Sequence, residues 1–293
     1  MKKFIFILFI VVIGLTFVLK DTQEPVDFTV GAKAMILIDA ESGKVIYEEN
    51  SKEALPIASM SKLMTQYLVL DAVENGTLSW EDTYEPSEYV QQILGHSAFV
   101  KLGMIAGRAY SVEELFTAMT VNSANDAAIA LAEMVSGTEA EFAKLMNAQA
   151  KKFKLKESTF FNASGLDGGY VGEGTEKTNR SSARDVSVII QNLLDTYPNV
   201  LDFTRLTSFK ASTGATLWST NLMLPGMPQA LSGIDGLKTG YTDEAGSCFA
   251  STGVFDDRRV ISVVIDVEAN GEDAINPRFE LTRELIENFI INN

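Results

Sequence analysis

The strand-like segments of this chain lie near its two ends, and this placement limits the folds open to it. A buried-strand pattern covers residues 34–38, and a turn leads from it to a second strand over 45–47. Similar patterns return at 236–241, 247–254 and 259–267. Strands joined by short turns pair in antiparallel fashion. We therefore expect an α/β sandwich in which both ends of the chain complete one antiparallel sheet flanked by helices.

The middle of the chain has helical patterns. Ser111 and Glu114 form a capping box, which predicts the start of a helix reaching about residue 120. From about residue 77 to 160 strand signals are few, so we expect an all-α insertion beside the sheet. The helices expected in and after this block cover residues 111–120, 127–135, 138–152, 182–194, 200–206 and 276–291.

One predicted helix has a polar pair at its start. Ser59 stands where an apolar helix should begin, and Lys62 follows three residues later. Side chains at this spacing share a helix face, and the first backbone N–H groups of a helix have no partner within it. The lysine could therefore activate the serine, and backbone donors could hold an oxyanion. The pair alone is weak evidence, since it more often represents a helix cap and a solvated lysine.

The amino-acid composition limits which partners and catalytic groups this chain can use. The 293 residues carry a formal net charge of −15, which disfavours nucleic acid as a partner. His96 is the only histidine and Cys248 the only cysteine, so a His/Cys zinc cluster and intrachain disulfides are excluded. We expect no metal and no cofactor. A serine hydrolase of this composition must use His96 or a lysine as its base. We interpret His96 as a loop or packing residue and Cys248 as a small buried residue.

The N-terminus has the pattern of an export segment. Lys2 and Lys3 precede an uncharged apolar run over 4–19. Residues 1–20 therefore predict a signal peptide or an uncleaved signal anchor, and residues 21–31 a polar tether. The absence of small residues just after the run favours the anchor. Either interpretation places the remaining chain outside the cytoplasm, bound to the membrane through this segment or secreted to the cell wall.

Two further motifs follow downstream. Ser123-Ala124-Asn125 lies at an expected loop-to-helix junction, and Lys238-Thr239-Gly240 lies on an expected strand. With Ser59-x-x-Lys62, they stand in the order found in class A β-lactamases and penicillin-binding proteins, where the middle residue of the second motif is aspartate. Three motifs in this order, on a helix, a loop and a strand, are far more specific than one.

The sequence around these motifs sharpens the resemblance. Residues 235–242 and 123–127 closely resemble the D-alanyl-D-alanine carboxypeptidases, the low-molecular-weight penicillin-binding proteins of serine peptidase family S11. Residues 36–44 and 182–185 are similar to the same family, and the resemblance covers residues 32–291. It implies the β-lactamase/DD-peptidase-like fold, with residues 32–293 as one serine DD-peptidase domain.

The resemblance and the chemistry together suggest roles in acylation. Ser59 attacks the carbonyl of a D-Ala–D-Ala bond, and Lys62 takes its proton. Burial and the nearby Lys238 would lower the pKa of Lys62 enough for this. Ser123 relays the proton to the leaving amine, and Asn125 orients the substrate amide.

The remaining site residues would bind the substrate. Lys238 and Thr239 meet its terminal carboxylate, and Gly240 leaves room for the substrate along the strand. The resemblance implies that the backbone N–H groups of Tyr241 and the attacking serine form the oxyanion hole. It also suggests that Arg278 supports the carboxylate.

The leading hypothesis is an exported carboxypeptidase that trims peptidoglycan stem peptides and is acylated by penicillin. The chain has no Glu-x-x-Leu-Asn stretch to activate a deacylating water, so we expect β-lactams to act as slowly released inhibitors. A transpeptidase of the same fold and a penicillin-sensing module without turnover remain alternatives. Many family members carry a further C-terminal β-domain and an amphipathic helix; this sequence ends at the predicted last helix, so we expect the N-terminal segment to be the tether.

Overall fold

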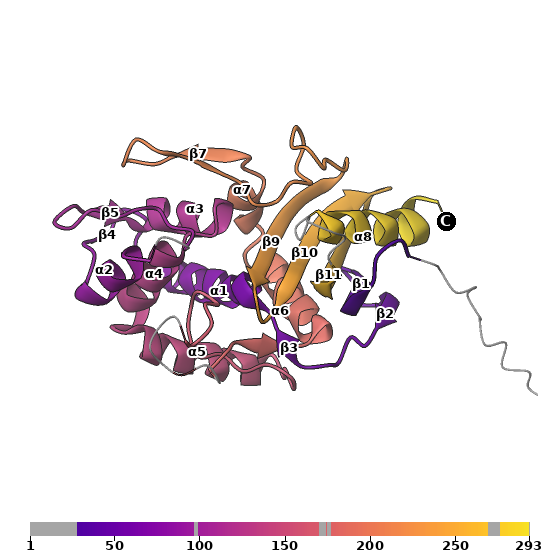
Figure 1. Ribbon diagram of the computed structural model, residues 1–293, viewed down its shortest axis with the longest axis horizontal. Helices are drawn as coiled ribbons and strands as arrows, with labels where there is room; N and C mark the ends of the chain where they lie inside the picture. The colour runs from indigo at the N-terminus through magenta and orange to yellow at the C-terminus, as the bar shows by residue number, and fades with distance from the viewer. Residues whose placement is uncertain (1–27, 97–98, 170–173, 175–176, 269–275, 293) are drawn as a thin grey trace, which may run out of the picture.

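The computed structural model describes residues 28–96, 99–169, 174, 177–268 and 276–292. One five-stranded antiparallel sheet, in the order β2-β1-β11-β10-β9, forms half of the molecule (Figure 1). This sheet confirms the predicted fold class, because its first two strands come from the start of the domain and its last three from the end. The strands are β1 Ala32–Asp39, β2 Val45–Glu49, β9 Ile234–Thr242, β10 Gly246–Phe255 and β11 Arg258–Val267.

Both faces of the sheet are buried, and the alternation of side chains along each strand explains how. On β1, Ala34, Ile36 and Ile38 point into the core cluster that contains helices α1 (Lys62–Glu74) and α6 (Ala183–Thr196). Met35 and Leu37 point to the opposite face, into a second cluster that contains helix α8 (Pro277–Ile286). A strand buried on both faces has a continuous apolar sequence, which is why residues 34–38 show no alternation.

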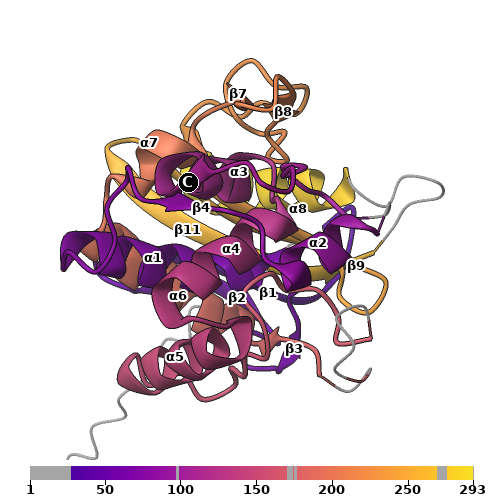
Figure 2. The same ribbon diagram turned by 90° about the vertical axis from the view of Figure 1, so that its left-hand side faces the viewer.

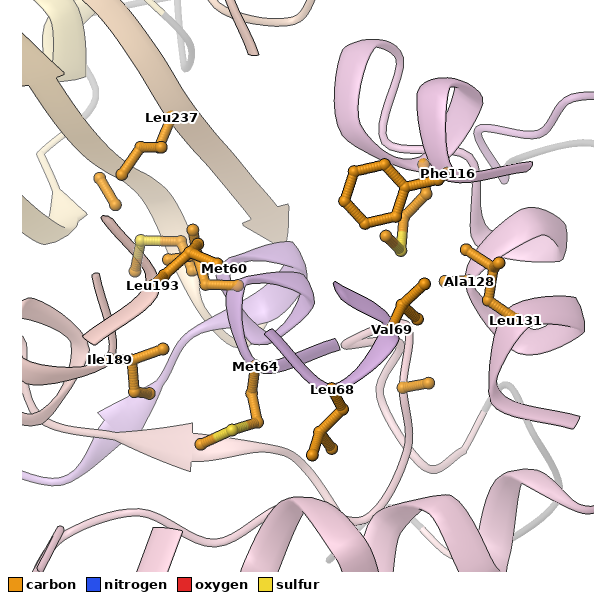
Figure 3. Packing of buried hydrophobic residues seen from close by; sticks show 14 of the residues in the cluster. Met60, Met64, Leu68, Val69, Phe116, Ala128, Leu131, Ile189, Leu193 and Leu237 are labelled. Atoms are coloured by element: carbon orange, nitrogen blue, oxygen red, sulfur yellow. The ribbon is translucent and has the colours of Figure 1, made fainter. Parts of the chain in front are cut away.

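Helix α1 (Lys62–Glu74) lies at the centre of the molecule, between the sheet and the helices of the 77–160 segment (Figure 1). Figure 3 shows Met64, Leu68 and Val69 of this helix among apolar side chains from the surrounding elements. Its buried residues face every side, so it has almost no amphipathic character. The burial of all sides agrees with the apolar sequence of this helix, and it fixes α1 relative to both halves of the fold.

The segment between residues 77 and 160 is mainly helical, as predicted, but not entirely. It contains α2 (Glu88–Leu94), α3 (Val112–Val121), α4 (Asn125–Ser136) and α5 (Glu139–Lys152). Figure 2 views the molecule from the side of these helices. The predicted cap is confirmed, because the Ser111 side chain accepts a hydrogen bond from the Glu114 N–H. Helix α2 was not predicted from the sequence, and neither was the pair of short strands β4 (Thr83–Tyr84) and β5 (Tyr110–Ser111).

The chain returns to the sheet through further helices and short strand pairs. Helix α6 (Ala183–Thr196) packs on β1 and β11, and α7 (Val200–Thr204) contacts β9. Helix α8 (Pro277–Ile286), which continues as a π-helical turn over Glu287–Ile291, covers the other face at β10 and β11. Short strands that the sequence analysis did not predict pair as β3 (Leu55–Pro56) with β6 (Arg180–Ser181) and β7 (Ser208–Lys210) with β8 (Thr216–Trp218).

The predicted export segment, residues 1–20, and the tether as far as residue 27 lie outside the described residues. Residues 28–31 belong to the folded domain, which therefore starts earlier than the predicted residue 32. Val30 is buried, and the ring of Phe28 packs edge-on against Tyr47 at 5.5 Å. None of the helices within the described ranges is long and apolar enough to cross a membrane.

Candidate active site

Ser59 lies in a tight turn that comes before the central helix. The turn is a 3-10 helix over Ala58–Ser61, and α1 begins only at Lys62. The prediction that the helix begins at Ser59 is therefore wrong by one turn, and Ser59 does not cap it. Ser59 is half-buried, and its Oγ accepts a hydrogen bond from the Nζ of Lys62 at 3.0 Å.

Lys62 is fully buried, and its amine has a complete set of acceptors. Besides the Ser59 Oγ, it donates to the Asn125 Oδ1 at 2.8 Å and to the Ser164 carbonyl oxygen. An ammonium group has three N–H donors and would use all of them here. A neutral amine would keep the last two bonds and could accept the hydroxyl proton of Ser59. The same geometry therefore accommodates lysine before and after proton transfer.

Burial lowers the pKa of Lys62 to about 7, against the opposing charges of Glu139 and Asp126. A lysine with this pKa is partly neutral at neutral pH, as a general base requires. We expected Lys238 to lower the pKa of Lys62, but in the structure the charge of Lys62 lowers the pKa of Lys238. Burial lowers the pKa of Lys238 well below its usual range, and the charges of Lys62 and Arg278 lower it further.

Lys238 and Thr239 lie on β9, which is an edge strand of the sheet and packs against the Ser59 turn. Lys238 is almost completely buried, and its Nζ donates to the Thr239 carbonyl oxygen at 3.0 Å. The Thr239 hydroxyl donates to the Thr220 Oγ1 at 2.7 Å. The strand therefore presents a buried amine and a hydroxyl pair beside the reactive turn.

Gly240 is required by protein packing rather than only by space for a substrate. A Cβ at this position would lie 2.8 Å from the Ile57 carbonyl oxygen and 3.3 Å from the Met60 nitrogen. Contacts this short force the backbone to shift. The glycine thus lets β9 approach the turn that carries Ser59, and the room for a substrate expected from the sequence stays a prediction.

Ser123 and Asn125 bring the helical block to the same cleft. Ser123 has a left-handed backbone, with φ +67°, at the turn between α3 and α4. Within the described ranges no residue hydrogen-bonds its hydroxyl, whereas Asn125 is bound to Lys62. The cleft has a volume of about 280 Å³. Its lining comes from both halves of the fold and includes Ser59, Val100, Ser123, Asn125, Gly165 and Tyr241.

Tyr241 and Arg278 occupy different environments. Tyr241 is 50% exposed at the cleft. Arg278 is buried, and its Nη1 donates to the carbonyl oxygens of Gly240 at 3.0 Å and Cys248 at 3.3 Å. Burial lowers the pKa of Arg278 to about 10. The guanidinium therefore braces the pairing of β9 with β10, and a role on a substrate carboxylate stays a prediction.

Neither Cys248 nor His96 lies where the chemistry is expected: Cys248 is a buried strand residue, and His96 is an exposed loop residue. Cys248 is fully buried in β10, opposite Gly240, and burial raises the pKa of its thiol to about 12. The His96 ring packs on Phe99 with the ring centroids 4.9 Å apart.

Sequence reasoning missed several residues that shape the site. Ser164 was not among the predicted site residues, yet its carbonyl oxygen binds the Lys62 amine. Gly165 permits the approach of that loop, because a Cβ there would lie 2.0 Å from the Ala58 carbonyl oxygen. Glu139 and Thr220 come from elements distant in sequence. Backbone contacts and long-range side-chain contacts produce no recognisable sequence motif. Only the turn residues at 162–166 could have indicated that this loop contributes to the site.

Comparison with known proteins now identifies the family. A model of the D-alanyl-D-alanine carboxypeptidases, peptidase family S11, matches residues 19–269. The chain belongs to this family. The resemblance seen in the three motifs is thus confirmed, and the cleft between β9, the Ser59 turn and Ser123 is the candidate active site of an S11 member.

Curated relatives of this S11 chain are longer than it. The chain is 33% identical over 273 residues to the D-alanyl-D-alanine carboxypeptidase DacF of Bacillus subtilis (strain 168), covering 90% of this chain and 66% of the relative. It is 32% identical over 254 residues to DacC of Escherichia coli (strain K12), covering 83% of this chain and 58% of that protein. The chain therefore spans less than two thirds of the length of these relatives.

Solved structures of S11-like proteins have the same fold. One is a peptidoglycan synthesis regulatory factor, PBP3, from Streptococcus pneumoniae, with 38% identity and a TM-score of 0.85, covering 89% of this chain and 74% of that one. Another is penicillin-binding protein D2 from Listeria monocytogenes in a cefotaxime-bound form, with 38% identity and a TM-score of 0.77. That match covers 90% of this chain and 98% of the other.

Proposed function

We propose that this S11 protein is a serine D-Ala–D-Ala carboxypeptidase that removes the terminal D-alanine from peptidoglycan stem peptides. The observation that carries the proposal is the hydrogen bond between the Ser59 hydroxyl and the buried Lys62 amine, whose pKa lies near 7. A serine nucleophile next to a partly neutral lysine is the arrangement that acyl transfer without histidine needs.

In the acylation step, the Ser59 Oγ attacks the carbonyl carbon of the scissile bond, and its proton moves to Lys62. The carbonyl electrons move to the oxygen, which backbone N–H groups of Ser59 and Tyr241 stabilise. Asn125 keeps the Lys62 amine aimed at the hydroxyl, since the two side chains are hydrogen-bonded. It also orients the substrate amide.

Collapse of this intermediate breaks the C–N bond and releases D-alanine. The leaving nitrogen takes a proton from the Ser123 hydroxyl, which Lys62 then replenishes. Within the described ranges no residue hydrogen-bonds the Ser123 hydroxyl, so it is available to a substrate in the cleft. Water then attacks the Ser59 ester and gives a proton to Lys62; the acyl C–O bond breaks, Lys62 returns the proton to the Ser59 oxygen, and the shortened peptide leaves.

The substrate carboxylate binds at the β9 end of the cleft. Lys238 and Thr239 meet it there, and the Thr239 hydroxyl, which donates to the Thr220 Oγ1 in the free site, turns its proton to the carboxylate. An incoming carboxylate favours the protonated form of Lys238, which compensates the effect of burial on its pKa. As the edge strand of the sheet, β9 can offer backbone groups on its unpaired side to an extended peptide.

β-Lactams would acylate Ser59 in the same way, which agrees with the cefotaxime-bound form of the Listeria relative. The N-terminal apolar segment would export the domain and hold it at the outer face of the membrane, or release it to the wall after cleavage. This location gives the enzyme access to stem peptides.

The full chain, incubated with a fluorescent penicillin and with a peptide ending in D-Ala–D-Ala, tests the proposal. We expect labelling at Ser59, confirmed by intact mass, and release of D-alanine, with both lost in Ser59→Ala. Lys52→Ala, which removes an exposed lysine, is the matched control and should retain both. Labelling without D-alanine release, even with an amine acceptor, would indicate a sensor; release only with the acceptor would indicate a transpeptidase. No labelling would refute the assignment.

A further inference from the structure

Glu139 is a buried carboxylate behind the candidate active site. It is the first residue of α5, and only 6% of its surface is exposed. Glutamate is seldom buried to this extent unless it is paired. Its Oε1 accepts a hydrogen bond from the Ala163 N–H at 2.9 Å, and its Oε2 accepts one from the Tyr89 hydroxyl at 2.7 Å. Both oxygens are therefore acceptors, as in an ionised carboxylate.

The Ala163–Ser164 segment connects this carboxylate to the lysine. Its Ala163 N–H is held by Glu139, while its Ala163 carbonyl oxygen accepts from the Thr65 hydroxyl at 2.8 Å. The next carbonyl oxygen, of Ser164, accepts from the Lys62 amine. Thr65 and Lys62 both belong to α1, so the segment is fixed between α5 on one side and α1 on the other.

We propose that Glu139 is a positioning residue for Lys62. It holds the Ala163–Ser164 backbone so that the Ser164 carbonyl oxygen aims the Lys62 amine at Ser59. Its carboxylate also places a negative charge near that amine. This role rests on the proposed acylation chemistry. It assigns a task to a side chain that does not touch the substrate and belongs to none of the three motifs.

The charged groups around Lys62 and Glu139 determine how the pKa of Lys62 should change when Glu139 is replaced. Lys62 faces Glu139 from α5, Asp126 from α4 and Lys238 from β9, and both carboxylates raise its pKa against burial. Glu139 itself faces Glu133 of α4 and Tyr89 of α2 besides Lys62; burial, and to a lesser extent Glu133, raise its pKa. Glu139 therefore limits how far burial can lower the pKa of Lys62, and its removal should lower that pKa further.

Two variants separate the charge from the hydrogen bond. Glu139→Gln can keep an acceptor for the Ala163 N–H but removes the charge, whereas Glu139→Ala removes both. Glu141→Gln is the matched control, because it neutralises an exposed carboxylate in the same helical turn. Thermal denaturation at each pH checks that every variant is folded.

The first readout is the titration of Lys62 in the full chain, followed by NMR of lysine labelled with ¹³C at Cε and assigned with Lys62→Met. We expect the midpoint to fall by about one pH unit in Glu139→Gln and to stay in place in Glu141→Gln. The second readout is the rate of acylation by a fluorescent penicillin against pH. Its acidic limb should move with the titration, and the plateau should fall about tenfold only in Glu139→Ala.

A folded Glu139→Gln with the Lys62 midpoint of the wild type would overturn the role of the charge. A folded Glu139→Ala with an unchanged plateau would overturn the role of the hydrogen bond. Failure of the wild type to react with penicillin would refute the proposed function instead. The NMR titration would still decide the coupling between Glu139 and Lys62 in that case.

Discussion

The carbonyl oxygen of Ile57 lies 2.8 Å from the point where a Cβ at Gly240 would stand. This contact places the turn that carries Ser59 directly against the edge strand of the sheet. The candidate site is therefore an interface between two halves of the fold, and the width of that interface controls its geometry.

Gly240→Ala should widen this interface. The added methyl group must displace either β9 or the Ser59 turn, and we expect about 1–3 kcal/mol of lost stability and at least a tenfold slower acylation of Ser59. Urea denaturation and penicillin labelling measure the two effects.

The control for this change is Gly253→Ala, whose Cβ would lie 2.6 Å from the Gly233 carbonyl oxygen at a distance from the cleft. It should lose comparable stability and retain its labelling rate per folded molecule. Equal labelling rates in the two variants would contradict the proposed role of the contact.

Acylation should depend on pH through Lys62. Because burial lowers the pKa of this lysine to about 7, the neutral fraction that can accept a proton falls as the pH falls through 7. The second-order rate of penicillin labelling should therefore rise from pH 5 and level off above pH 8. Lys62→Arg should lose about 100-fold or more at every pH, since arginine stays charged. A rate that is constant from pH 5 to 8 would argue against Lys62 as the base.

Ser123→Ala should separate activity from stability. No residue in the described part of the chain hydrogen-bonds the Ser123 hydroxyl, so its loss leaves no buried polar group unpaired. We expect a free energy of unfolding within about 0.5 kcal/mol of the wild type and acylation about 100-fold slower. Calorimetry and stopped-flow labelling provide the two numbers, and an unchanged rate would remove Ser123 from the proton path.

Arg278→Gln should weaken the end of the sheet. The buried guanidinium binds two carbonyl oxygens, of Gly240 and Cys248, and glutamine cannot span both. We expect a loss of about 2–4 kcal/mol in the free energy of unfolding, measured with urea.

Arg283→Gln is the matched control for this variant. Arg283 lies on the same helix and also donates to two backbone carbonyl oxygens, of Gln229 and Ala230, but it is more exposed. Its loss should cost within about 1 kcal/mol. Similar losses in both variants would mean that burial of the Arg278 contact adds nothing.

The sequence alone determined the sheet and its strand regions, because short, continuous apolar runs bounded by turn residues are typical of strands that are buried on both faces. The capping box at Ser111 correctly located α3, since the cap depends only on residues close in sequence. The short strands β3 to β8 escaped prediction, because pairs of two or three residues are held by partners far along the chain.

The three motifs likewise named Ser59, Lys62, Ser123 and Lys238 from the sequence, because chemistry restricts the residue types that can serve. Only the tertiary structure decided how they act on one another. Burial, which lowers the pKa of Lys62, is a property of the packed core and of no local pattern. The contacts of Lys62 with Ser164 and of Gly240 with Ile57 join segments far apart in sequence, and one of their partners is a backbone carbonyl that every residue has. Such contacts leave no signature in the sequence, so their geometry emerges only when the chain is folded.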